Sequence, residues 1–257
     1  RDEIGDLSAA LGDMTHTLYE RLDAIESFAA DVAHEIKNPL TSLRSAVETM
    51  ARIKDPAQQK ELLDIIHDDV RRLDRLISDI SDASRLDAEL SRAEFQPVDL
   101  GDLCESLAEV YRARSAAGEA GGTKSPRLIL DLSDRGRLKV EGMAGRLGQV
   151  ARNLLDNAVS FSPPDSSIRL AARRQGDWVI LTIEDEGPGL PADSLEAVFE
   201  RFYSARPSDE TFGLHSGLGL SIARQIILAH GGTISAENRL GNGAHPGGAR
   251  LIVRLPA

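Results

Sequence analysis

Cysteine, tryptophan and long apolar runs are scarce or absent in this sequence. One residue of 257 is cysteine, Cys104, so an internal disulfide framework is excluded and a reducing compartment is favoured. Nothing around Cys104 is typical of an activated thiolate, and we interpret it as a small apolar side chain rather than a nucleophile. No apolar run reaches the roughly eighteen residues that a membrane-spanning helix needs. No signal-peptide pattern is present either.

Aromatic and basic residues are also few. Aromatic residues make up 4% of the chain, so its core has to rest on Leu, Ile, Val and Ala. Lys and Arg number 30 against 41 Asp and Glu, which gives a net charge of -11. This balance argues against a nucleic-acid partner, because binding phosphates needs a basic face. The 41% apolar content and the length fit a globular protein of one or two domains.

The first ninety residues are predicted to form two long helices. Lys54-Asp55-Pro56 interrupts the pattern as a turn between them. Apolar residues recur three or four apart, close to a heptad seam, at Leu18, Leu22, Ile25, Ala29, Val32, Ile36, Leu40, Leu43, Val47 and Met50, and then at Leu62, Ile66, Val70, Leu73, Ile77 and Ile80. One hairpin cannot enclose so wide a seam, so we expect two copies to form an antiparallel four-helix bundle.

His34 is the residue of chemical interest in the first helix. It lies two residues, about 200°, around the helix from the seam residue Val32, so it is predicted to face solvent. The alternative, a histidine packed in the core, conflicts with this periodicity. Pro39 removes one backbone hydrogen bond and is expected to kink the helix locally. The kink can serve a mobile or reactive neighbour, or be tolerated without a role.

From about residue 95 the pattern changes to mixed strands and helices. Residues 95–100 read as an extended connector, 115–125 as a Gly/Ala/Ser-rich loop. Helices are expected at about 100–115, 143–160 and 217–230, and strands at 127–133, 167–173, 178–184, 233–238 and 250–255. This arrangement predicts a two-layer α/β sandwich. The fold class is therefore α + α/β, a dimeric helical bundle followed by the sandwich.

Two polar motifs lie in the first part of the predicted sandwich. Asn153 and Asn157 are four residues apart, which places both amides on one helix face. Amide oxygens suit Mg²⁺ when a ligand's phosphates supply the charge, although a polar surface is the alternative. Asp185-Glu186-Gly187-Pro188-Gly189 follows a strand, where a carboxylate can accept the exocyclic N–H of adenine. An ordinary turn at the strand end is the alternative.

Two further motifs follow in order. Phe199-Glu200-Arg201-Phe202-Tyr203 is an aromatic cluster, which alone indicates core packing. Gly217-Leu218-Gly219-Leu220 opens a helix, where free N–H groups and the positive end of the helix dipole favour phosphate. Helix capping is the alternative for the glycines taken alone.

Together, in this order and spacing, the four motifs resemble the ATP-binding domain shared by histidine kinases, DNA gyrase, a heat-shock chaperone and the MutL repair protein. The resemblance implies ATP and Mg²⁺, with Asn157 and Asn153 at the metal. Residues 204–216 then correspond to the flexible ATP lid, and Gly247-Gly248 to a weaker final glycine motif. The implied nucleotide-binding residues are Asn153, Asn157, Asp185, Gly187, Gly189, Phe199, Phe202, Gly217, Leu218, Gly219 and Leu220.

The segment Phe28 to Leu40 resembles the H box of sensor histidine kinases, and its residues are similar to those of one proteobacterial subgroup. It implies that His34 is phosphorylated, that Glu35 accepts a hydrogen bond from its other ring nitrogen, and that Asn38 positions water for dephosphorylating a partner. Residues 1–19 resemble the second helix of a HAMP module. The domains expected are then 1–19, the dimerisation and phosphotransfer hairpin at 20–93, and the catalytic ATP-binding domain at 94–257.

The family resemblance also implies partners and a location. A response-regulator receiver domain would dock on the bundle and take the phosphoryl group on an aspartate. Because the sequence begins with Arg1 and a HAMP-like helix, we expect a cytoplasmic piece of an inner-membrane protein, reaching the membrane only through other segments.

The sequence departs from the family at Ser160, three residues after Asn157. Members of the family usually have a Lys or Arg at this position. Arg152, Arg201 or Arg206 could replace this phosphate cation. Two other hypotheses remain: an ATPase that drives clamp motion without a phosphohistidine, and a nucleotide-binding scaffold without catalysis.

Overall fold

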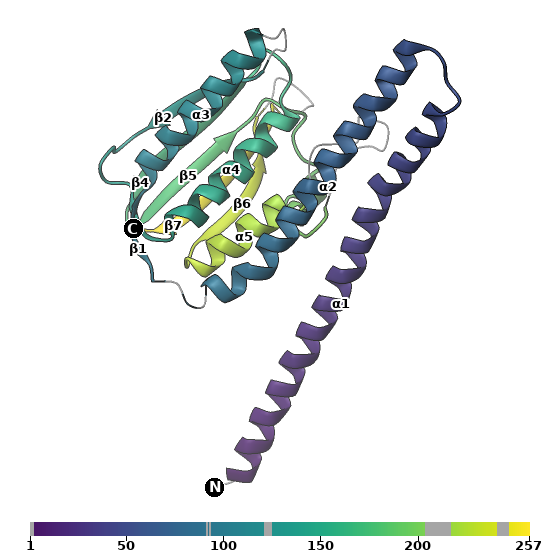
Figure 1. Ribbon diagram of the computed structural model, residues 1–257. Helices are drawn as coiled ribbons and strands as arrows, with labels where there is room; N and C mark the ends of the chain where they lie inside the picture. Colours follow the sequence, from purple (N-terminus) through teal and green to yellow (C-terminus); the bar gives the residue numbers. More distant parts are fainter. Residues whose placement is uncertain (1–2, 91, 93, 121–124, 204–216, 241–246) are drawn as a thin grey trace. The chain divides into compact units, whose positions relative to one another are not determined.

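The computed structural model describes the chain apart from residues 1–2, 91, 93, 121–124, 204–216 and 241–246 (Figure 1). It divides into two compact units, Arg1–Asp74 and Arg75–Ala257, so that one long helix contributes to both. The predicted domain boundaries after residues 19 and 93 stay predictions. None of the helices in the described residues is long and apolar enough to cross a membrane.

Two long helices form the N-terminal hairpin, α1 (Glu3–Met50) and α2 (Pro56–Leu90). The predicted turn is confirmed, and its chemistry explains where α2 begins. The Asp55 carboxylate accepts a hydrogen bond from the Ala57 N–H at 3.2 Å, as an N-cap does, and Pro56 occupies the first helical position. Pro39 lies inside α1, which is assigned as continuous helix, and its side chain is buried. The predicted kink stays a prediction.

A five-stranded sheet in the order β2-β4-β5-β7-β6 forms one layer of the second unit. Its strands are β2 (Arg127–Leu132), β4 (Ser167–Gln175), β5 (Trp178–Glu184), β6 (Thr233–Asn238) and β7 (Ala249–Pro256). β2 and β4 are parallel, and the other pairs are antiparallel. Alternate residues are buried along β4 (Ile168, Leu170 and Ala172) and along β7 (Leu251, Val253 and Leu255), as expected for a sheet covered on one face.

Three helices form the second layer, side by side over this sheet (Figure 1). They are α3 (Leu100–Ala120), α4 (Ala144–Phe161) and α5 (Gly219–Ala229). The predicted α/β sandwich is therefore confirmed. The prediction of a loop from residue 115 is wrong as far as residue 120, because the Ala-rich end of α3 continues the helix. Two short 3₁₀ turns, Ala192–Ser194 and Ala197–Phe199, follow β5.

A second, two-stranded sheet was not predicted. β1 (Gln96–Asp99), within the expected connector, pairs antiparallel with β3 (Lys139–Gly142). The imidazole of His230 supports this region, because its Nε2 accepts the Met143 N–H at 3.1 Å. Its Nδ1 then carries the proton and donates to the Ile226 carbonyl at 2.8 Å. The ring of Phe95 stacks on this imidazole at 4.7 Å, so a buried histidine joins the connector to the start of α4.

Candidate nucleotide-binding and phospho-acceptor sites

The asparagine pair lies on α4, whose opposite face is anchored in the core. The buried residues of that face are Leu147, Gly148, Val150, Ala151, Leu154, Leu155 and Ala158. The Nδ2 of Asn153 donates to the Gly219 carbonyl at 2.9 Å, so its oxygen stays available. Asn157 is half-buried, and its amide makes no hydrogen bond to any residue that the structure describes. The two amides thus share a helix face, but only Asn153 is tied to α5.

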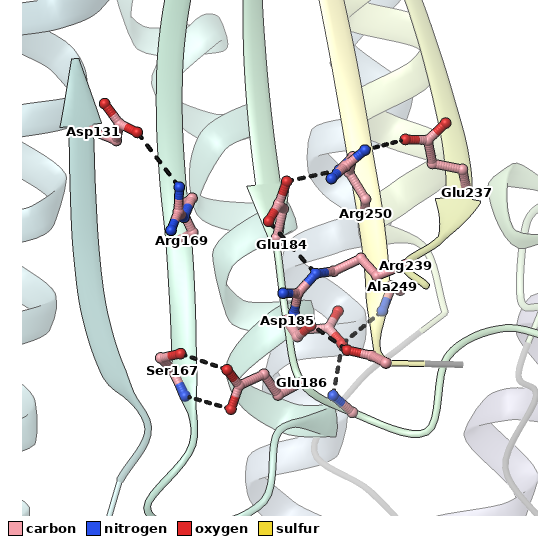
Figure 2. A network of polar contacts seen from close by, with 12 residues as sticks. Asp131, Ser167, Arg169, Glu184, Asp185, Glu186, Glu237, Arg239, Ala249 and Arg250 are labelled. Carbon is pink, nitrogen blue, oxygen red and sulfur yellow. Dashed lines mark hydrogen bonds and ion pairs between the residues drawn. The ribbon is translucent and has the colours of Figure 1, made fainter. Parts of the chain in front are cut away.

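Asp185 is a buried carboxylate just beyond the end of β5, 4% exposed. Its Oδ1 accepts two backbone hydrogen bonds, from Gly187 at 2.9 Å and from Ala249 at 3.0 Å (Figure 2). Burial raises the pKa of Asp185, and the two backbone N–H groups and the nearby Arg239 oppose this rise. Because both backbone donors use Oδ1, the orientation of the carboxylate is fixed and Oδ2 remains for a ligand donor.

The second glycine motif brings a helix N-terminus and the aromatic motif together. Gly219 is the first residue of α5, so the first N–H groups of this helix have no partner within it. Gly217 has φ +71°, and its carbonyl accepts a hydrogen bond from the Phe202 N–H at 3.0 Å. A Cβ at Gly217 would lie 2.8 Å from the Cα of Phe202, so no larger residue fits without movement. The predicted phosphate cradle is therefore assembled from two segments.

The remaining predicted nucleotide-binding residues are placed unequally. Phe199 and Leu218 are buried, at 4% and 1% exposure, and pack in the core. Gly187 and Gly189 lie in the turn after Asp185, and Leu220 is half-buried in the first turn of α5. The expected lid at residues 204–216 lies outside the described residues. Of the cations proposed to replace a basic residue at Ser160, Arg152 and Arg201 are exposed, and Arg206 lies outside the described residues.

In the N-terminal unit, His34 is exposed, which confirms its predicted outward position on the single chain. Asn38 is exposed one turn further along α1. Glu35 is half-buried, and its Oε2 accepts a hydrogen bond from Nη2 of Arg72 on α2 at 3.0 Å. The exposed histidine and asparagine therefore share an accessible stretch, whereas the carboxylate between them faces the other helix.

Two residues that hold the candidate nucleotide-binding residues were not predicted from the sequence. The Tyr111 hydroxyl on α3 donates to Oδ1 of Asp156 at 2.5 Å and so links α3 to the asparagine helix. Arg239, directly after β6, contacts the Asp185 carbonyl. The glycine pair Gly247-Gly248 was the one signal near this second contact.

Comparison with known proteins finds two protein families that match different parts of the chain. The family described as "Histidine kinase-, DNA gyrase B-, and HSP90-like ATPase" matches residues 142–257, and the "His Kinase A (phospho-acceptor) domain" matches residues 24–89. A hairpin with an exposed histidine, followed in the chain by an ATP-binding sandwich, defines the histidine kinase class. The chain belongs to the sensor histidine kinases, and within them it is ChvG-like, in agreement with the subgroup that the sequence of the H box indicated.

The most similar relatives include the sensor protein ChvG of Rhizobium meliloti, 51% identical over 265 residues and covering all of this chain and 44% of that protein. The kinase/phosphatase MprB of Mycobacterium tuberculosis is 32% identical over 99% of this chain and 49% of its own length. This chain thus spans less than half of these relatives. Histidine kinase ThkA, solved in complex with the response regulator TrrA, matches with TM-score 0.70 and 26% identity over 92% of this chain and 63% of that one.

Proposed function

We propose that this chain is the catalytic core of a histidine kinase that transfers the γ-phosphoryl group of ATP to His34 and then to an aspartate of a response regulator. The observation that carries this proposal is an exposed His34 in the phospho-acceptor hairpin of a chain that also holds the ATP-binding fold. Response-regulator docking is supported by ThkA, which binds one.

The nucleotide would be held by groups that the fold leaves available. Oδ2 of Asp185 would accept the adenine amino group, and the first N–H groups of α5 would bind phosphate oxygens. Asn157 would ligate Mg²⁺ through its amide, which has no hydrogen-bond partner among the described residues, with the Asn153 oxygen beside it. Bound there, Mg²⁺ supplies charge neutralisation for the triphosphate.

In the transfer step, a ring nitrogen of neutral His34 forms a bond to the γ-phosphorus. The bond from this phosphorus to the β–γ bridging oxygen breaks, and ADP leaves with that electron pair. The proton on the other ring nitrogen stabilises the product by hydrogen bonding to a nearby acceptor. Glu35 could supply this acceptor only by leaving Arg72, since its Oε2 is paired with that guanidinium.

A second copy of the chain would complete the bundle. Large apolar side chains remain more than 40% exposed along both hairpin helices, and a partner hairpin would cover them. They are Leu18, Leu22, Ile25, Leu40, Val47, Val70 and Ile77. A phosphatase activity is a second proposed function, supported by the exposed Asn38 one turn from His34. The cytoplasmic location stays a prediction.

The test uses γ-labelled ATP and Mg²⁺ with three proteins: wild type, His34→Ala and His67→Ala. His67 is an exposed histidine of the same hairpin and serves as the matched control. Wild type and His67→Ala should carry acid-labile, alkali-stable label, and His34→Ala should carry none. Label that persists in His34→Ala would contradict the assignment of His34 as the phosphorylated residue. Steady turnover without label would favour the clamp ATPase, and neither label nor turnover would favour the scaffold.

A further inference from the structure

Arg239, directly after β6, reaches the end of β5 next to Asp185, although β7 lies between these two strands in the sheet. Its Nη1 donates to the Asp185 carbonyl at 2.6 Å and to the Gly247 carbonyl at 3.2 Å. Its Nε lies 3.5 Å from Oε2 of Glu184 (Figure 2). One half-buried guanidinium thus connects the residue after β6, the turn before β7 and the end of β5.

The backbone around this guanidinium is closely packed on Asp185. The Arg239 N–H donates to the Gly248 carbonyl at 2.9 Å, and the Gly247 N–H donates to the Arg239 carbonyl at 3.0 Å. Gly248 has φ +115°, and a Cβ there would lie 1.9 Å from the Asp185 carbonyl oxygen. Ala249, the next residue, supplies one of the two N–H groups on Oδ1 of Asp185. Arg239 therefore holds the turn that orients the carboxylate.

We propose that Arg239 is a positioning residue of the nucleotide site, which holds the turn on Asp185 and so fixes this carboxylate for recognition of the adenine amino group. The inference rests on the proposed function, in which Oδ2 of Asp185 accepts that amino group. A neutral carboxyl at this position would lose acceptor strength on Oδ2, so a cation beside it matters for binding. The alternative is that Arg239 only stabilises the fold through its ion pair with Glu184.

The charged groups around Asp185 make Arg239 the relevant cation. Glu184 and Glu186 flank it in the chain, but the Glu184 carboxylate pairs with Arg239 and Arg250, and that of Glu186 accepts hydrogen bonds from Ser167. Arg250 on β7 contacts Glu184 at 2.7 Å and Glu237 at 2.7 Å, and it is not among the groups that affect the pKa of Asp185. Arg239 does affect it, in the direction that favours the charged carboxylate.

Arg250 therefore provides a matched control, because it shares Glu184 with Arg239 but makes no hydrogen bond or ion pair with Asp185. The experiment measures binding of Mg²⁺-ATP and Mg²⁺-ITP to the full chain by calorimetry between about pH 5 and 8. ITP carries a carbonyl where ATP carries the amino group, so the ratio of the two affinities reports recognition at Asp185. The proteins are wild type, Arg239→Gln, Arg250→Gln and Asp185→Asn.

For Arg239→Gln we expect about five- to tenfold weaker ATP binding, a smaller preference for ATP over ITP, and loss of binding on acidification that begins at a higher pH than in wild type. Arg250→Gln should stay within about twofold of wild type with an unshifted pH profile. Asp185→Asn should lose the preference, because an amide has one acceptor oxygen where the carboxylate has two.

Two outcomes would overturn different claims. If Arg239→Gln behaves like Arg250→Gln while Asp185→Asn loses binding, the role of Arg239 is wrong and the proposed site stands. If Asp185→Asn keeps wild-type affinity and preference, the proposed adenine contact fails, and the inference with it. Should Arg239→Gln not fold, Arg239→Lys carries the test: its retained charge should keep the wild-type pH profile while ATP binding weakens about two- to threefold. A shifted profile in that variant contradicts the proposal.

Discussion

The carboxylate of Glu35 accepts a hydrogen bond from Arg72 at 3.0 Å, although the residue before it is the proposed phospho-acceptor His34. Adjacent residues on a helix point about 100° apart, so Glu35 can face α2 while His34 faces solvent. Arg72 and Glu35 are only 14% and 24% exposed at their side chains. This carboxylate is thus held by the hairpin before any reaction with ATP.

The first prediction concerns the strength of this ion pair. Arg72→Met should lower the free energy of unfolding by about 1–3 kcal/mol, because it leaves the half-buried Glu35 carboxylate without its charged donor. Arg71→Met is the control, since Arg71 lies 3.8 Å from Asp68 on the exposed surface and should cost under about 0.5 kcal/mol. Urea titrations of the two variants check this, and equal losses would contradict it.

The second prediction separates the two asparagines. Asn157→Ala should abolish the Mg²⁺-dependent part of ATP binding with little change in stability, because the amide has no described partner to lose. Asn153→Ala should weaken binding and also lower stability by about 1 kcal/mol, through loss of its hydrogen bond to Gly219. Calorimetry with and without Mg²⁺, beside thermal unfolding, distinguishes them. A destabilised Asn157→Ala variant would show that this amide has a structural role instead.

The third prediction tests the closeness of the glycine and aromatic motifs. Gly217→Ala should destabilise by about 2–4 kcal/mol, since it combines a positive φ with a clash against Phe202. Gly176 has a similar φ of +62° and open space around it, so Gly176→Ala should cost only about 1–2 kcal/mol. Chemical unfolding measures both, and the difference between them isolates the steric part. No difference would mean that the Phe202 backbone yields freely.

The fourth prediction is a pH dependence at Cys104. Burial, with Asp99 and Glu105 nearby, raises the pKa of this thiol to about 12. The folded state therefore favours the protonated thiol. The contribution of this thiol to the free energy of unfolding is fully present below the ordinary thiol pKa of about 8.5. Above that pH the unfolded chain loses the proton first, so stability falls by up to about 1.4 kcal/mol per pH unit.

Cys104→Ala removes this contribution and supplies the comparison. The difference in free energy of unfolding between wild type and variant should be constant below about pH 8 and shrink from there towards pH 10. Urea titrations at several pH values measure it. Parallel stability curves for the two proteins up to pH 10 would show that the thiol is not protected by burial.

Local sequence patterns were sufficient for most of the fold. The spacing of Val32 and Ile36 placed His34 outside, and the largely apolar run at 178–184 predicted β5 with the bounds that the structure gives. The pattern failed for β3, a short strand without a longer alternating run, and at the end of α3, where alanines extend the helix into the expected loop. Four residues give too little periodicity to separate a strand from a loop, and pairing with β1 is what stabilises β3.

By itself, the sequence determined the family, the exposed position of His34 and the residue types of the proposed nucleotide site, because these depend on motif order and on periodicity along one segment. Only the tertiary structure decided which groups hold those residues. Arg239 reaches Asp185 across 54 positions of sequence, and Arg72 reaches Glu35 across 37. Such contacts depend on how strands and helices distant in sequence pair, and a long polar side chain carries no local signal of the carbonyl or carboxylate that it will meet.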